Sequence, residues 1–165
     1  MDKIEELLKD PKTDLQKQAL TDKSYKKMPN NQDCKINFEL ATYGDAILKC
    51  VLCKIYFERE DEDNFGFKGK LTEWKKQYES DEVLVKFIAR HYDILNCLNF
   101  DRDDTKKPHD YDYQGKNAKR RYKYIATAME ASIAAVYLEN GENEVIEIVK
   151  QWIEWIDKVT NSSDT

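Results

Sequence analysis

NFELATYGDAILKCVLCKIYF, residues 37–57, is the stretch of this chain that decides its fold. Its apolar side chains recur every three or four residues, which predicts a mostly buried helix: they are Leu40, Ile47, Val51, Leu52 and Ile55. Gly44 and Asp45 stand at its centre. Glycine costs roughly 1 kcal/mol relative to alanine in a helix interior, and a buried carboxylate needs a partner, a proton or a metal. The pair indicates either a site that an ion or another element approaches, or an exposed aspartate beside a packing glycine.

The composition predicts one helical domain. Of the 165 residues, 41% are hydrophobic and 36% are charged, with only five glycines and three prolines, a balance typical of soluble, mostly helical proteins. With a net charge of −5, any nucleic-acid contact needs a local basic patch or a bound cation. No apolar run approaches the ~20 residues of a membrane span, and the N-terminus is charged throughout. We expect an intracellular protein of the cytoplasm or nucleus with no membrane partner.

Cysteine and histidine offer no obvious metal site. Cys50 and Cys53 form a CxxC inside the apolar helix, without a second pair, and helix packing explains them better than metal or redox chemistry. His91 and His109 lack the spacing of metal ligands. We therefore expect no zinc.

The rest of the chain predicts an all-α fold, in which two long core helices pack with several shorter ones. Thr13 is a good N-cap, with Gln16 completing a capping box, and Thr72 and Ser80 are further caps. The expected helices cover 2–9, 14–20, 36–59, 72–78, a segment after Ser80, 117–139 and 142–157. The expected loops are 26–35, the acidic 58–69 and the long 98–115. We expect one domain over 1–160, a disordered tail over 161–165 and no double-stranded-RNA-binding domain in this chain.

The second long helix carries an acidic residue in its apolar face. Glu130 lies among Ile125, Met129, Ile133 and Val136, and Asn140-Gly141 is a typical helix end. Antiparallel packing of the two long helices would bring Glu130 to Asp45. Two carboxylates in one site need a divalent cation or a proton between them, and a hard cation held in this way suits phosphodiester hydrolysis. The alternative is a structural network in which a tyrosine or lysine holds the carboxylate.

A basic cluster precedes this glutamate. Its members are Lys116, Lys119, Arg120, Arg121 and Lys123, with tyrosines interleaved. Such side chains bind the phosphates of nucleic acids, although an ordinary solvated helix start is the alternative. Lys123 lies seven residues before Glu130, so both project from one face of the helix.

Four blocks, taken in order, resemble the ribonuclease III catalytic domain: ALTDKSY (19–25), NFELATYGDAILK (37–49), LTEWKKQYESDEVLVKFI (71–88) and ATAMEASIAAVYLENG (126–141). The resemblance implies an all-helical, usually dimeric endonuclease that cuts double-stranded RNA with Mg²⁺, or with Mn²⁺ in its place. It implies four carboxylates in each site, and products with 5′-phosphate and 3′-hydroxyl ends.

This sequence matches only part of the metal site that the resemblance implies. Asp45 and Glu130 match two of the four metal-site carboxylates, whereas the other two fall on Ala41 and Thr127. A further acidic position falls on Phe38, and the phenylalanine of the family's dimer contact falls on Thr42.

Two interpretations follow from the resemblance. In the first, the chain is a noncanonical Dicer-like nuclease in which Asp45, Glu130 and the Thr127 hydroxyl or a water hold the cation. Lys123 then resembles the lysine of Dicer-type sites and neutralises the scissile phosphate. In the second, the domain is inactive and serves to bind RNA or to assemble subunits. Both expect a homodimer through the 37–57 helix and no organic cofactor. The residues expected to contact RNA are Lys116, Lys119, Arg120, Arg121, Lys75 and Lys76.

Overall fold

The computed structural model describes residues 1–59 and 69–162, and within them the fold is all-α, as the sequence predicts. The main helices are α1 (Lys3–Lys9), α2 (Asp14–Ala19), α3 (Phe38–Arg59), α4 (Lys70–Glu79), α7 (Ala118–Asn140) and α8 (Glu142–Ser162). The shorter turns are η1 (Tyr25–Lys27), α5 (Asp81–Val83), η3 (Leu84–Ala89), α6 (Arg90–Tyr92) and η4 (Ile94–Asn96). The only pairing of extended backbone among these residues is an isolated bridge between Thr21 and Asn99.

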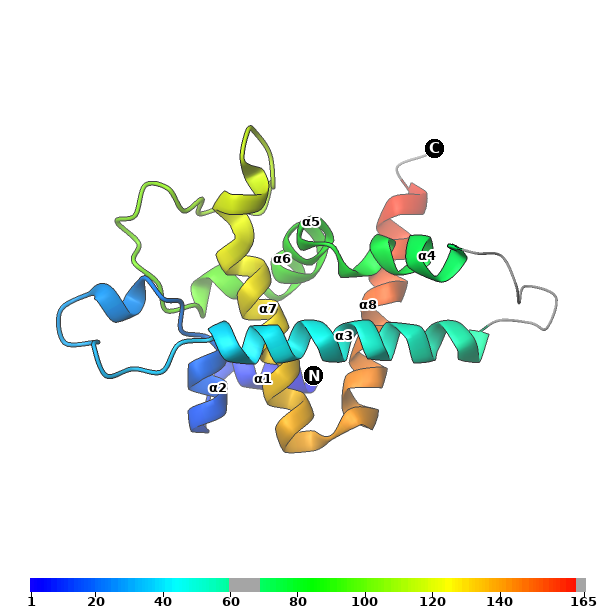
Figure 1. The fold of residues 1–165 in the computed structure, drawn as a ribbon, viewed down its shortest axis with the longest axis horizontal. Coiled ribbons are helices and arrows are strands. Elements are labelled where there is room, and N and C mark those ends of the chain that lie inside the picture. Colours follow the sequence, from blue (N-terminus) through cyan, green and yellow to red (C-terminus); the bar gives the residue numbers. More distant parts are fainter. Residues whose placement is uncertain (60–68, 163–165) are drawn as a thin grey trace.

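The two long helices cross at Gly44. Figure 1 shows α3 running across α7 rather than alongside it, so the expectation of antiparallel packing is wrong. A Cβ atom on Gly44 would lie 1.7 Å from the backbone oxygen of Glu130 and 3.3 Å from the backbone nitrogen of Ala134. Only a residue without a side chain lets the two backbones approach this closely. Crossed helices contact each other over a short length, and Gly44 lies at the point where their backbones are closest.

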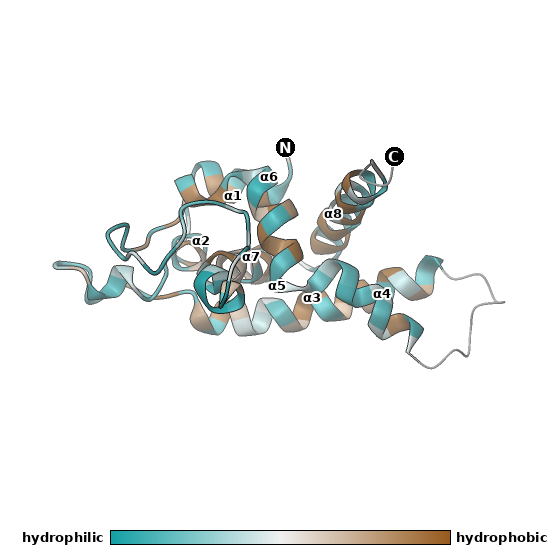
Figure 2. Ribbon diagram, turned by 90° about the horizontal axis from the view of Figure 1, so that it is seen from above, coloured by the Kyte–Doolittle hydropathy of each residue, from teal (hydrophilic) through white to brown (hydrophobic). Residues whose placement is uncertain are grey.

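The remaining helices complete one core around that crossing. All five apolar residues that define the 37–57 pattern are buried in α3. Helix α8 buries the face formed by Val145, Ile148, Val149, Trp152, Ile153 and Ile156. Figure 2 shows hydrophobic residues on α7 and α8 and largely hydrophilic loops at the opposite end of the molecule. The periodicity of the sequence therefore identifies the core faces correctly.

Local signals place some helix starts and miss others. The Thr13 hydroxyl accepts a hydrogen bond from the Gln16 backbone at 3.1 Å, as expected. The Gln16 side chain, however, accepts from the Lys12 backbone, one residue before the expected capping-box donor. Thr72 is not a cap, because α4 begins at Lys70, directly after Gly69 with its φ of +100°.

The Ser80 cap is confirmed, and it starts a longer helical run. The Ser80 hydroxyl accepts from the Val83 backbone at 3.3 Å. Segments α5, η3 and α6 then follow one another without a break, with the wider turns of a π-helix over Leu84–Ala89.

The long loop between η4 and α7 is fastened to the core at several points. Lys107 forms an ion pair of 2.9 Å with Asp22, and both side chains are nearly buried. The Tyr124 hydroxyl donates to the Pro108 carbonyl, and the Arg102 guanidinium donates to the Leu95 carbonyl at 3.0 Å. The loop therefore forms a fixed wall beside the first turns of α7.

The structure differs from the sequence-based expectations at Cys50 and at the end of α8. Cys50 is exposed on α3, so core packing does not explain it. Helix α8 reaches Ser162 rather than about residue 157. Most of the acidic loop, residues 60–68, and the last three residues of the expected tail lie outside the described residues. None of the helices in the described part of the chain has the length and hydropathy that a membrane span needs.

Gly44→Ala tests whether the crossing depends on a bare backbone. The new methyl group must push the Glu130 backbone away, and we expect a loss of about 3 kcal/mol or more in the free energy of unfolding, although alanine is the better helix former. Urea unfolding followed by circular dichroism measures the loss. Ala46→Gly, at an exposed position of the same helix, is the control and should cost only about 1 kcal/mol. An alanine variant as stable as the wild type would contradict this account of the crossing.

Candidate active site and nucleic-acid interface

A groove of about 700 Å³ lies over the crossing of α3 and α7. Four parts of the chain line it: the first half of α3, the junction of α4 and α5, the long loop at Tyr113, and α7. Asp45, Lys123, Thr127 and Glu130 all face this groove. The structure thus brings together all four residues for which the sequence predicts a catalytic or metal-binding role.

Asp45 is half-exposed and pairs with a lysine of its own helix. Its Oδ2 lies 2.7 Å from Lys49 Nζ, one helical turn away, and 36% of its side chain is accessible. The hydrogen bond that Lys49 donates to Asp45 raises the pKa of Lys49, so the lysine stays charged. Asp45 therefore satisfies both interpretations of the sequence: it borders solvent, and it also faces the groove beside α7.

Glu130 is buried and depends on one lysine for charge compensation. Only 7% of its side chain is accessible, and Lys123 Nζ lies 3.3 and 3.5 Å from its two oxygens. Burial raises the pKa of Glu130 to about 7 despite Lys123, and the negative charges of Asp81 and Asp45 add to this effect. A buried carboxylate in this state binds a proton or a cation readily.

Lys123 divides its charge between two carboxylates. Its Nζ also lies 3.0 Å from Oδ1 of Asp81, a residue of α5 whose side chain is 14% accessible. Burial alone would lower the pKa of Lys123, but Glu130 and Asp81 together raise it. One ammonium group thus holds α5 and α7 together across the groove.

Two carboxylate oxygens at the α4–α5 junction have no hydrogen-bond partner within residues 1–59 and 69–162. They are Oδ2 of Asp81 and Oε2 of Glu79, and both are inaccessible to solvent. Glu79 does have an ion pair with Lys75, at 3.5 Å. Sequence reasoning missed Asp81 and Glu79 because acidic residues beside a capping serine are common at helix starts. The signal that could have found them is the resemblance block 71–88, which contains both.

The carboxylates of the groove do not converge closely. Ala41 and Thr127 line it where the resemblance would place two acids. No group of three or more histidine, cysteine, aspartate or glutamate side chains in the described ranges 1–59 and 69–162 is arranged to hold a metal ion. A cation at this site would therefore draw on one or two carboxylates, with water completing its shell.

The expected RNA contacts fall on different surfaces. Lys76 and Lys119 line the groove, whereas Arg120 and Arg121 line a neighbouring pocket. Lys116 is exposed but borders neither of these hollows. Lys75 is occupied by its ion pair with Glu79. Two of the six residues predicted to contact RNA, Lys76 and Lys119, therefore lie beside the acidic centre of the groove.

The raised pKa of Glu130 predicts a pH dependence of stability. In the native protein this carboxyl keeps its proton up to about pH 7, whereas an unfolded glutamate releases it near 4.5. The native state therefore binds more protons in this window, and the free energy of unfolding should fall on the order of 2 kcal/mol as the pH rises through it. Urea unfolding in EDTA at several pH values between these limits measures the fall.

Glu130→Gln cannot ionise, so this variant should lose that part of the pH dependence. Glu147→Gln, at an exposed ion pair on α8, is the matched control and should keep it. A Glu130→Gln protein with the wild-type pH profile would rule out Glu130 as the source.

Comparisons with known proteins agree with this architecture. A family model described as Ribonuclease-III-like matches residues 12–155. Ribonuclease 3 of Azotobacter vinelandii is 30% identical over 140 residues, covering 85% of this chain and 52% of that protein. Ribonuclease 3 of Nitratiruptor sp. is 28% identical over 140 residues, with 85% and 54% covered. The chain spans about half the length of these curated relatives.

The solved structures show the same fold. The nuclease domain of ribonuclease III from Campylobacter jejuni superposes with a TM-score of 0.68 at 23% identity, covering 92% of this chain and 94% of that one. A second structure of the same domain gives a TM-score of 0.67. The matched family model, the relatives and the shared fold together show that this chain belongs to the ribonuclease-III-like family.

Proposed function

We propose that this chain is a Dicer-like endoribonuclease that hydrolyses double-stranded RNA with a divalent cation. The observation that carries the proposal is that two carboxylates, the buried Glu130 and the largely buried Asp81, share the single ammonium group of Lys123. Their charge is only partly compensated, and one Asp81 oxygen has no hydrogen-bond partner among the residues that the structure describes. Structural carboxylates are normally fully paired, whereas an excess of buried negative charge is typical of a cation site.

The side chains of the groove fit a hard cation with few protein ligands. Asp45 and Glu130 would hold it, and Thr127 would reach it through its hydroxyl or a water, with Asp81 as an additional carboxylate. Mg²⁺ commonly keeps several waters and needs only one or two carboxylates, and Mn²⁺ accepts the same oxygen ligands. When bound, the cation would supply an activated water and would neutralise charge on the phosphate.

The lysines of the groove would receive the RNA. Lys123 is charged and points at the acidic centre, so it would neutralise the scissile phosphate once the substrate enters. Lys76 and Lys119 line the same groove and would contact flanking phosphates. Attack of water on the phosphorus and release of the 3′ oxygen would leave 5′-phosphate and 3′-hydroxyl ends.

A homodimer through α3 is part of the proposal. The outer side of this helix exposes Tyr43, Cys50 and Phe57, with the small Ala46 between them. An exposed stripe of this kind on a long helix suits a partner helix. Because Thr42 replaces the family's interface phenylalanine, the contact would rest on these neighbouring side chains.

A second candidate function is supported by the two missing acids. Ala41 and Thr127 bring no carboxylate into the groove, and no three metal-binding side chains converge in the part of the chain that the structure describes. An inactive domain that binds double-stranded RNA or assembles subunits would show this pattern. Cleavage decides between the two functions.

Incubation of the protein with long duplex RNA tests the enzyme directly. We expect cleavage in Mg²⁺ and none in EDTA, and a loss of about 100-fold or more in Asp45→Asn, because the remaining ligands hold the cation poorly. Asp81→Asn should also lose activity, while Asp14→Asn at an exposed position of α2 should cut like the wild type. If the wild type shifts the RNA in a gel but does not cleave it, the result would favour the inactive RNA-binding domain. If it neither shifts nor cleaves the RNA, the result would favour a domain that assembles subunits.

Thr127→Asp tests the account of the missing acid. The new carboxylate would stand one helical turn before Glu130 and add charge to a site with few ligands, so we expect tighter Mg²⁺ binding by about tenfold and faster cleavage at limiting Mg²⁺. The measurement is the Mg²⁺ dependence of cleavage, with Thr127→Asn as the uncharged control. A variant with unchanged Mg²⁺ dependence would place the cation away from Thr127.

A further inference from the structure

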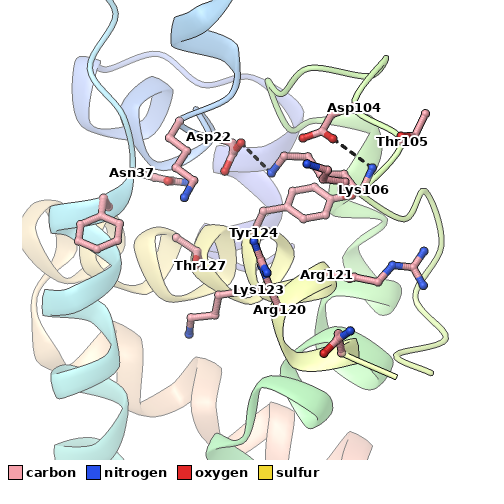
Figure 3. A pocket seen from close by; sticks show the side chains of 14 residues that line it. Asp22, Asn37, Asp104, Thr105, Lys106, Arg120, Arg121, Lys123, Tyr124 and Thr127 are labelled. Carbon is pink, nitrogen blue, oxygen red and sulfur yellow. Dashed lines mark hydrogen bonds and ion pairs between the residues drawn. The ribbon is translucent and has the colours of Figure 1, made fainter. Parts of the chain in front are cut away.

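A second hollow adjoins the groove, and most of the residues that line it have no role in the proposed chemistry. Its volume is about 690 Å³, and it lies between the start of α7, residues 22–23 and the loop over residues 104–107 (Figure 3). Phe38, Lys123 and Thr127 line both this pocket and the groove. A ligand in the pocket would therefore touch the same side chains as a substrate in the groove.

The pocket carries a strong positive charge in an acidic protein. Six lysine and arginine residues line it, against two aspartates. Both acids already have partners, because Asp22 pairs with Lys107 at 2.9 Å and Asp104 accepts from the Lys106 backbone at 3.0 Å. Among the residues that the structure describes, three further cations of this pocket form no ion pair with a carboxylate: they are Lys23, Lys106 and Arg120. Arg121 lies near Asp110 and helps to lower the pKa of that carboxyl.

One wall of the pocket is held by contacts of Asp22 and Lys107. Asp22 accepts hydrogen bonds from the Ser24 backbone at 2.9 Å and from its hydroxyl at 2.6 Å, in addition to Lys107. Lys107 Nζ also lies 4.1 Å from the centre of the Tyr124 ring. Asp22 and Lys107 therefore neutralise each other, and the positive charge of the other lysines and arginines of the pocket remains for a ligand.

We propose that this pocket binds the phosphate of an unpaired nucleotide in the RNA strand beside the duplex. The inference rests on the proposed function, because it takes the groove as the place of the duplex. The volume suits a single nucleotide, and arginine and lysine bind phosphate strongly. Phe38 lies between the two hollows with 64% of its surface exposed, and aromatic rings of this kind stack on unpaired bases.

Binding of adenosine 5′-monophosphate in EDTA at low salt tests the pocket without any cleavage. We expect the wild type to bind this probe, with adenosine at least tenfold weaker because it lacks the phosphate. Lys106→Ala/Arg120→Ala should weaken the nucleotide about tenfold. Lys12→Ala/Lys17→Ala removes the same charge from exposed positions near α2 and should bind like the wild type. Isothermal titration gives the affinities, and thermal unfolding checks that each variant is folded.

Three results would overturn the inference: no binding of the nucleotide by the wild type, equal binding of adenosine, or equal affinity of the pocket and control variants. Labelled duplexes, blunt or with a short unpaired extension, then test the RNA itself. The wild type should prefer the extended duplex, and the pocket variant should lose that preference. Asp45→Asn should abolish cleavage and keep nucleotide binding. Failure of cleavage in the wild type therefore leaves the pocket measurable, and failure of the pocket leaves cleavage measurable.

Discussion

The contact of Gly44 with the backbone of Glu130 is the constraint on which the rest of this structure depends. Two helix backbones can approach to this distance only where one of them has no side chain. The crossing fixes the position of both helices at one point, and it thereby positions the residues next to that point. Asp45 follows the glycine in sequence, and Glu130 provides the carbonyl itself, so both acids border one groove. The helix propensity that glycine sacrifices is small beside the packing that it permits.

The main property of the groove is its incompletely compensated negative charge. Each of its carboxylates is matched with a lysine, but the matching is incomplete, since Lys123 serves both Asp81 and Glu130. Burial keeps Glu130 close to protonation at neutral pH. Such a site stores unfavourable electrostatic energy, which a ligand of suitable charge releases on binding. The two positions without acids, Ala41 and Thr127, reduce the negative charge that a cation would find. The third carboxylate, Asp81, comes from a different helix and partly restores it.

The groove and the neighbouring pocket form one continuous surface with opposite charge at its two ends. The acidic end lies over the helix crossing, and the basic end lies under the loop that Asp22 and Lys107 fasten. Lys123 and Thr127 stand at the border of the two. A polyanion that places one phosphate at the acidic centre would place its neighbours among the cations. The net charge of −5 therefore does not describe the local charge of this surface, where we propose that RNA binds.

The sequence by itself determined the helices, their buried faces, the close approach at Gly44 and the pair Asp45 and Glu130. These follow from short-range periodicity and from residues that are locally unfavourable, both of which can be read along one segment. Only the tertiary structure decided that α3 and α7 cross rather than lie antiparallel. It also decided that Asp81 and Glu79 face the groove, that Lys75 is occupied by an ion pair and that Cys50 is exposed. These features depend on how the α4–α5 junction and the long loop dock against α7. Docking brings together residues far apart in the sequence, and no local pattern encodes which of their faces will meet.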